Sequence, residues 1–195
     1  MKERLESLTR ETAETSIEAS VNLDGSGRSV VSTGLGFLDH MLATLARHSG
    51  FDIELRCKGD LEVDDHHSAE DCALALGACI DGGLGERRGI ARFGWAYAPL
   101  DEALARAVID LSGRPYARVE LGLQRESIGK LACENLTHFL SSLATAARAC
   151  LHIDVIEGAN DHHRAEAAFK ALAQAIAAAV APGCSEGAPS TKGVL

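Results

Sequence analysis

Histidine and glutamate recur in this sequence in a pattern that could bind metal ions. Of eight histidines, six fall in two copies of one motif, in which a lone histidine precedes His-His-x-x-Glu. The copies comprise His40, His66, His67 and Glu70, and then His138, His162, His163 and Glu166. Imidazole and carboxylate together suit Mn, Fe, Co, Ni or Zn. Shared helix composition does not explain such a duplication, so the sequence predicts a metal centre.

The spacing within each motif predicts how the ligands divide. His67 and Glu70 are three residues apart, which places both on one face of a helix. Adjacent residues diverge by about 100° around a helix, so neighbouring histidines should serve different ions. We therefore expect two sites of four ligands each, with open positions for substrate. One site would contain His40, His67, Glu70 and His162, and the other His66, His138, His163 and Glu166.

The bland alternative is a solvated helix start with accidental histidines. Asp65 and Asp161, which precede the two histidine pairs, could cap their helices or orient the imidazoles. His48 and His152 do not align across the repeat and are interpreted as ordinary polar or core residues.

The elements that must position these residues also repeat. Apolar periodicity predicts helices at 37–47, 66–84, 131–149 and 165–180. Alternation predicts strands at 12–23, 29–33, 51–58, 92–99, 104–111, 116–123 and 151–155, the first two around the turn signal at 24–27. The order strands, helix, strand, helix occurs twice, which indicates a duplicated half-domain. We expect one catalytic domain, 1–195, with repeats at about 10–88 and 90–181 and a tail at 182–195.

Composition limits the function classes. The chain has 195 residues, 46% of them hydrophobic, and a net charge of −9. This is a globular composition, and an acidic chain with one Trp is a poor nucleic-acid binder. No stretch approaches the roughly 18 apolar residues of a membrane span, and the start lacks a signal core. The expectation is a soluble cytoplasmic protein with reduced cysteines and no membrane partner.

Five segments resemble one enzyme family. They are GFLDHML at 36–42, DDHHSAED at 64–71, DLSGRPY at 110–116, NDHHRAE at 160–166 and PSTKG at 189–193. Together they resemble the imidazoleglycerol-phosphate dehydratase family of histidine biosynthesis, and the similarity covers essentially the whole chain. Some members carry a fused phosphatase domain, for which this chain has no room, so the expected form is monofunctional.

The resemblance implies both a fold and an activity. The fold would be α+β, with two half-domains that each have a mostly antiparallel sheet and helices on one face, like the second domain of ribosomal protein S5. The assembly would be a 24-mer built from trimers, with two Mn²⁺ per active site at subunit interfaces. The enzyme would be a hydro-lyase that converts imidazole glycerol phosphate, a small phosphate substrate, into imidazole acetol phosphate.

The chemistry explains why two ions are useful. No carbonyl flanks the carbon that loses its proton, so the imidazole ring must hold the electrons, and two cations on its nitrogens would favour the imidazolate. The resemblance assigns general acid/base work to Glu14 and phosphate binding to Arg92, Arg114, Ser190 and Lys192. Taken alone, Glu14 is one of several acids on an early strand, Arg114 a turn residue and Lys192 a solubilising tail residue.

Two other functions remain open from the residues alone. A dinuclear metallohydrolase acting on a phosphate ester is one, although such sites usually use bridging carboxylates. A metal-storage shell is the other, and it would need neither a phosphate patch nor Glu14. Thr44 and Thr137 depart from residues common in the family, and neither is an expected ligand.

Overall fold

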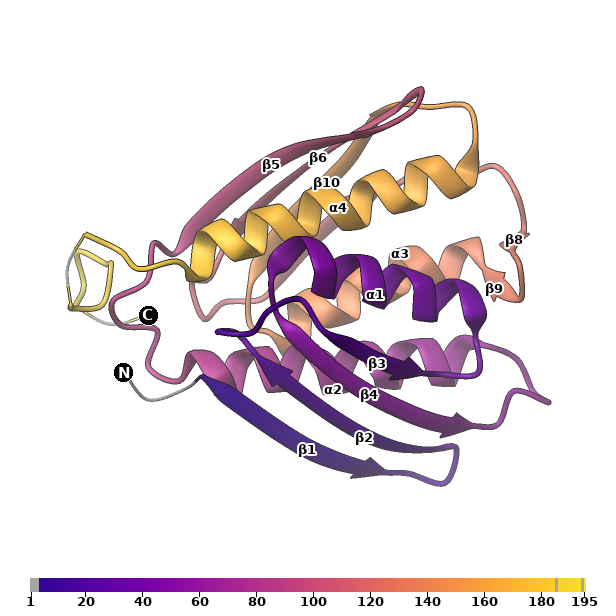
Figure 1. Ribbon diagram of the computed structural model, residues 1–195, viewed down its shortest axis with the longest axis horizontal. Coiled ribbons are helices and arrows are strands. Elements are labelled where there is room, and N and C mark those ends of the chain that lie inside the picture. Colours follow the sequence, from indigo (N-terminus) through magenta and orange to yellow (C-terminus); the bar gives the residue numbers. More distant parts are fainter. Residues whose placement is uncertain (1–3, 185, 194) are drawn as a thin grey trace.

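Two four-stranded sheets enclose a layer of helices (Figure 1). The computed structural model describes residues 4–184, 186–193 and 195. The first half contains β1 (Leu5–Glu11), β2 (Thr15–Asn22), β3 (Ser29–Ser32), α1 (Gly36–Ser49), β4 (Asp52–Gly59) and α2 (His66–Leu84). The second contains β5 (Phe93–Leu100), β6 (Ala103–Asp110), β7 (Tyr116–Glu120), β8 (Ser127–Ile128), β9 (Leu131–Ala132), α3 (Cys133–Ala146), β10 (Cys150–Glu157) and α4 (Asp161–Val180).

The two sheets share one topology. The first has the order β1-β2-β4-β3, and the second has the order β5-β6-β10-β7. In each sheet the first two pairings are antiparallel and the third is parallel. The α+β class and the mostly antiparallel, duplicated half-domain are thus confirmed.

Strand pairing departs from the expectation around the turn at 24–27. The predicted strands at 12–23 and 29–33 exist as β2 and β3, but β4 lies between them in the sheet and pairs with both. Strand β1 was not expected, because it is an edge strand whose side chains alternate only between exposed and half-buried. Its pattern therefore lacks the strong apolar alternation on which strand prediction depends.

Helix ends also differ from the predicted ranges. The predicted helix at 165–180 begins earlier, at Asp161, because the Asn160 side chain accepts a hydrogen bond from the backbone N–H of His162 (2.9 Å). This cap places both histidines of the second motif on the first turn of α4. The helix predicted from 131 begins at Cys133, since the preceding residues form the β8–β9 hairpin.

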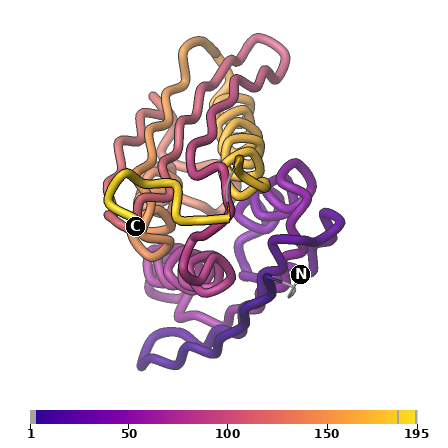
Figure 2. Tube along the Cα trace, turned by 90° about the vertical axis from the view of Figure 1, so that its left-hand side faces the viewer, coloured from indigo at the N-terminus to yellow at the C-terminus, as the bar shows by residue number. Residues whose placement is uncertain are grey.

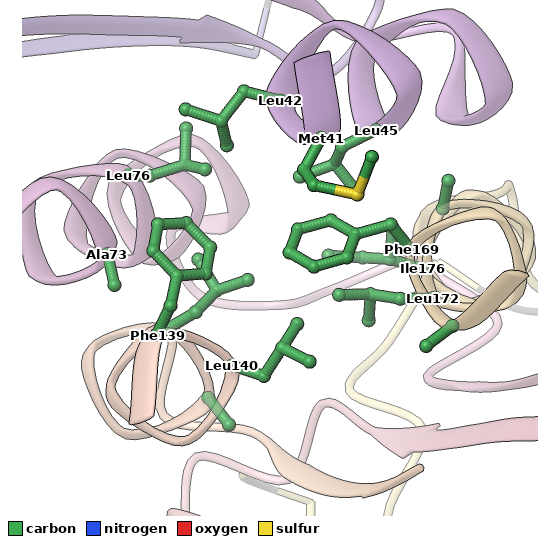
Figure 3. Close-up of a cluster of buried hydrophobic side chains, with 14 of the residues drawn as sticks. Met41, Leu42, Leu45, Ala73, Leu76, Phe139, Leu140, Phe169, Leu172 and Ile176 are labelled. Atoms are coloured by element: carbon green, nitrogen blue, oxygen red, sulfur yellow. The ribbon is translucent and has the colours of Figure 1, made fainter. Parts of the chain in front are cut away.

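The buried core comprises the helix layer and the sheet faces that pack against it. Side chains from all four helices converge there, as Figure 3 shows for Leu42, Leu76, Phe139 and Phe169. Because the chain has few aromatic residues, leucine and alanine fill much of the core. The small side chain of alanine lets elements approach each other closely. Gly94 of β5 illustrates this, because a Cβ at that position would lie 1.9 Å from the carbonyl oxygen of Ala175 in α4.

All four helices run in the same direction. Each begins at the right-hand end of Figure 1, so the histidines near their first turns gather at that end. The C-terminal segment lies at the opposite end, which faces the viewer in Figure 2. Among the described residues no helix has the length and apolar character needed to span a membrane.

Candidate metal centre and active site

The first cluster joins α1 to α4. His40 on α1 and His162 on α4 both point their Nε2 atoms at one oxygen of Glu166, Oε2, at 3.1 and 3.3 Å. One donor atom from each residue lies within 4.8 Å of the others. Burial alone would raise the pKa of Glu166, but hydrogen bonds from Lys170 and His40 together lower it. The cluster thus offers two imidazoles and an ionised carboxylate.

The second cluster joins α2 to α3 and repeats the first. His138 Nε2 lies 3.1 Å from Glu70 Oε1, and His66 Nε2 lies 3.8 Å from Glu70 Oε2. The two imidazole rings stack with centroids 4.9 Å apart. One donor atom from each of the three residues again lies within 4.8 Å of the others.

The donor set of both clusters fits a divalent transition metal. Two imidazoles and one carboxylate are ligands that Mn, Fe, Co, Ni and Zn accept. His138 Nε2 is buried and, despite its proximity to Glu70, makes no hydrogen bond of good geometry. Such an unsatisfied buried nitrogen is costly, and an ion at this position would satisfy it. His66 is also oriented for this role, because its Nδ1 lies 3.0 Å from Oδ1 of Asn135.

The contacts between glutamate and histidine differ from the expected pairs. Within one chain Glu70 contacts His66 rather than His67, and Glu166 contacts His162 rather than His163. Which of these residues share an ion stays a prediction. Residues four apart share a helix face as well as residues three apart. The deciding factor is the neighbouring helix, since Glu70 turns toward α3 and Glu166 toward α1.

The divergence of adjacent histidines is as expected. The rings of His66 and His67 are inclined by 75°, and those of His162 and His163 by 85°. His67 and His163 accordingly lie outside the two clusters of their own chain. The expected grouping of His40 with His162, and of His66 with His138, also agrees with the structure.

Carboxylates flank the two histidines outside the clusters. His67 Nδ1 lies 3.1 Å from Asp60 Oδ2, and His163 Nδ1 lies 2.8 Å from Glu102 Oε2. These contacts raise the pKa of both histidines. Conversely, the hydrogen bond from His163 and those from nearby backbone N–H groups lower the pKa of Glu102 to about 2.

Glu14 lies beside one of these histidines. Its Oε1 is 3.6 Å from His67 Nε2, and about half of its side chain is exposed (51%). The turn that carries Glu14 is fixed by Thr12, whose Oγ1 accepts hydrogen bonds from the backbone N–H groups of Glu14 and Thr15. A solvent-accessible carboxylate on a fixed turn can exchange protons with a ligand bound nearby.

Asp71 anchors that turn to α2 and was not assigned a role from the sequence. Its carboxylate is buried and accepts hydrogen bonds from Thr15 Oγ1 (2.5 Å) and Arg10 Nη2 (2.8 Å). Because Asp71 directly follows Glu70, one turn of α2 holds both a candidate ligand and the support for Glu14. Its position beside the motif was the only signal in the sequence.

The side chains of Asp65 and Asp161 have neither of the roles considered for them, which were capping a helix and orienting an imidazole. Asp65 Oδ2 accepts a hydrogen bond from the backbone N–H of Ala132 (2.6 Å). Asp161 Oδ2 accepts hydrogen bonds from the backbone N–H groups of Gln124 and Arg125. The two carboxylates therefore attach the segment between β7 and α3 to the starts of α2 and α4.

The residues assigned to phosphate gather in one pocket of about 630 Å³. It is lined by Arg92, Arg114, Ser190 and Lys192, among others. Arg92 is already engaged, because its Nε donates to Asp110 (2.7 Å) and its Nη1 to the carbonyl of Pro189 (2.9 Å). Arg114 and Lys192 are exposed. Arg92 thus holds the tail in place, while the other two cations are available to an anion.

A single chain does not bring this pocket to the two histidine–glutamate clusters. The backbone N–H of Arg92 donates to the carbonyl of Ala179, at the C-terminal end of α4, whereas His162 and Glu166 are at its N-terminal end. A helix of 20 residues is about 30 Å long. The expected site residues therefore form two groups at opposite ends of the helix layer.

The remaining singled-out residues lie in different surroundings. Thr137 lines a cavity beside His66 and His138, whereas Thr44 is buried in α1. His152 packs its ring near Tyr116 on the second sheet, at a centroid distance of 5.4 Å.

Known proteins resemble this chain in sequence and in fold. The family model described as imidazoleglycerol-phosphate dehydratase matches residues 33–176. A protein of that name from Saccharomyces cerevisiae is 59% identical over 165 residues, which cover 85% of this chain and 75% of that protein. One from Phytophthora nicotianae is 58% identical over 188 residues, 96% of this chain, but this chain spans only 42% of its length.

Solved structures agree with these sequence matches. The imidazoleglycerol-phosphate dehydratase of Staphylococcus aureus superposes with a TM-score of 0.83 at 34% identity, covering 92% of this chain and 99% of that one. The enzyme from Pyrococcus furiosus, solved in complex with (S)-C348, gives 0.83 at 36% identity, covering 96% and 100%. Because the family model and the relatives span most of its length, this chain belongs to the imidazoleglycerol-phosphate dehydratase family.

Proposed function

We propose that this protein is a cytoplasmic hydro-lyase of L-histidine biosynthesis that removes water from imidazole glycerol phosphate, giving imidazole acetol phosphate. The observation that carries the proposal is the pair of equivalent clusters, each with two histidines and one glutamate, at one end of the helix layer. An imidazole ring has two nitrogens, so a substrate containing one can engage two ions at once. The family assignment supports the same substrate.

The ions that we propose are Mn²⁺, two per active site. His40, His162 and Glu166 would hold one, and His66, His138 and Glu70 the other, in both cases with positions left for further ligands. When bound, the two ions would supply positive charge that favours the ionised form of the substrate ring. Ligand affinity does not select Mn²⁺, so its occupancy in the cell would depend on availability.

Glu14 is the acid/base in this proposal. Its carboxylate lies on the same side of the molecule as His67, 3.6 Å from the ring nitrogen Nε2. Thr12 and the buried Asp71 hold the backbone turn that carries Glu14, and neither of these hydrogen bonds uses its carboxylate. Glu14 can therefore take the proton from the carbon adjacent to the one that loses its hydroxyl, and it can return a proton to the product.

The active site is proposed to be shared between copies of the chain. The phosphate pocket of one chain lies about a helix length from its own clusters, which is too far for one small substrate to reach both. Arg114 and Lys192 would therefore serve the clusters of a neighbouring copy. A closed assembly satisfies this requirement for every chain, and a 24-mer built from trimers is the one that the family resemblance implies.

Purified protein incubated with Mn²⁺ and imidazole glycerol phosphate tests the proposal. We expect the ketone product to accumulate without release of inorganic phosphate. Release of phosphate would instead indicate the dinuclear hydrolase, although the two glutamates lie in separate clusters rather than bridging one pair of ions. Uptake of Mn²⁺ with neither product would indicate a storage shell. Either result would overturn the proposed activity.

A further inference from the structure

Two equivalent histidines have the same hydrogen-bonding environment but obtain it from unrelated positions. His67 and His163 occupy matching places in the repeat, and neither belongs to a cluster of its own chain. In both residues Nδ1 lies against a carboxylate, that of Asp60 or that of Glu102. The repeat that relates the histidines places Ile156 at the position matching Asp60, so duplication alone does not account for the second carboxylate.

Glu102 is itself held in place on three sides. It lies in the turn between β5 and β6. Its Oε1 accepts hydrogen bonds from the backbone N–H groups of Ala159 (3.1 Å) and Asn160 (2.8 Å), just before α4. Its Oε2 faces His163 Nδ1 at 2.8 Å. Both carboxylate oxygens therefore act as acceptors, and His163 must carry its proton on Nδ1.

Asp60 has a comparable position in the first half. It follows β4 directly, and its backbone N–H donates to the carbonyl of Glu14 (3.1 Å). Its two oxygens lie 3.3 and 3.1 Å from His67 Nδ1. The side chain thus sets the proton position on His67, while the backbone ties the same residue to the turn of Glu14.

We propose that Asp60 and Glu102 are positioning residues, which hold His67 and His163 with Nδ1 protonated and Nε2 free to bind an ion held mainly by a second copy of the chain. The inference rests on the proposed two-ion site. A neutral imidazole binds a metal through only one nitrogen, and an acceptor at the other nitrogen selects the tautomer that can do so. Neither carboxylate needs to touch an ion or the substrate.

Glu102→Gln is a sharp test, because glutamine cannot reproduce two acceptor oxygens. If its NH₂ group faces His163, it forces the proton onto Nε2 and blocks that nitrogen. If its NH₂ group faces the backbone, it opposes two N–H donors. In the first half the test is Asp60→Ala, which removes the acceptor, because the oxygens of Asp60 face only His67 Nδ1 and an asparagine could keep its own oxygen there. Glu157→Gln and Glu62→Gln are matched controls, since both residues are exposed acids near the same elements.

The measurement is a titration of each full-length variant with Mn²⁺ alone, followed by the electron paramagnetic resonance signal of the free ion. Loss of such a partner typically weakens metal affinity about 10–100-fold, and we expect this for Glu102→Gln and Asp60→Ala but not for the controls. Melting temperatures of the metal-free variants should match the parent. If one variant does not fold, the other carries the test.

The outcomes separate this inference from the proposed function. Parent protein that binds two Mn²⁺ per chain, with both variants binding equally tightly, would overturn the positioning role and leave the two-ion site intact. Parent protein that binds no Mn²⁺ would overturn both. Weakened binding together with a large fall in the melting temperature of both metal-free variants would indicate a merely structural role and would also contradict the proposal.

Discussion

Glu14→Gln should lower kcat by about 10²–10⁴-fold, the usual cost of losing a general acid/base, with a much smaller change in KM. Glutamine keeps the size and much of the hydrogen bonding of the side chain but cannot accept the proton. The metal clusters and the cations of the phosphate pocket are untouched by this change. Steady-state kinetics with verified Mn²⁺ content would measure the effect.

Lys192→Ala is the matched contrast. It removes a charge that would bind phosphate equally in the ground state and the transition state, so KM should rise more than kcat falls. The metal clusters remain intact in both variants, so any difference between them separates binding from proton transfer. A Glu14→Gln enzyme with near-normal kcat and normal metal content would show that Glu14 is not the acid/base.

Removing the metal should dismantle the assembly. In the proposed arrangement, His67 and His163 complete ion sites in neighbouring copies, so each ion links two chains and contributes its binding energy to the oligomer. We expect a chelator at neutral pH to yield smaller species and added Mn²⁺ to restore the large one. Light scattering, with metal content checked by elemental analysis, would follow the change. An unchanged assembly after complete metal removal would refute this link.

Acidification should have a related effect. The carboxylates of Asp60 and Glu102 raise the pKa of His67 and His163 above the ordinary value for imidazole, which is about 6.5. A raised pKa means that the protonated form, which cannot bind an ion, is populated at a higher pH than usual. As the pH falls, these two proposed ligands should be lost at a higher pH than an imidazole with the ordinary pKa would be.

Most of the predictions about individual elements and candidate ligands came from the duplicated motifs. The range of α2 agrees with the approximate prediction of 66–84, because its apolar periodicity and its glycine-rich end are both strong signals. Strand β1 was missed, because a half-buried edge strand has almost no such signal. The candidate ligands were predicted by residue type, but which glutamate contacts which histidine depends on the packing of α1 on α4 and of α2 on α3. Helical spacing alone contains no information about those neighbours.

The folded chain also separates two sets of residues that the sequence analysis assigned to one site. The motif around Lys192 was assigned to the same site as the histidines, because both would bind one substrate. The direction of α4 places the Lys192 segment and the histidines at opposite ends of the helix layer. Only a folded chain reveals that distance, and the distance is the reason for proposing that copies share each site.

Subunit mixing tests that central claim most directly. Glu14→Gln chains and Arg114→Ala/Lys192→Ala chains would be separated by chelation, mixed in equal amounts and reassembled with Mn²⁺. If the two groups meet across copies, random assembly gives about a quarter of the sites an intact Glu14 and an intact phosphate pocket. Dehydration of imidazole glycerol phosphate should then recover to about a quarter of the parent rate. A mixture no more active than the average of its two components would contradict a shared site.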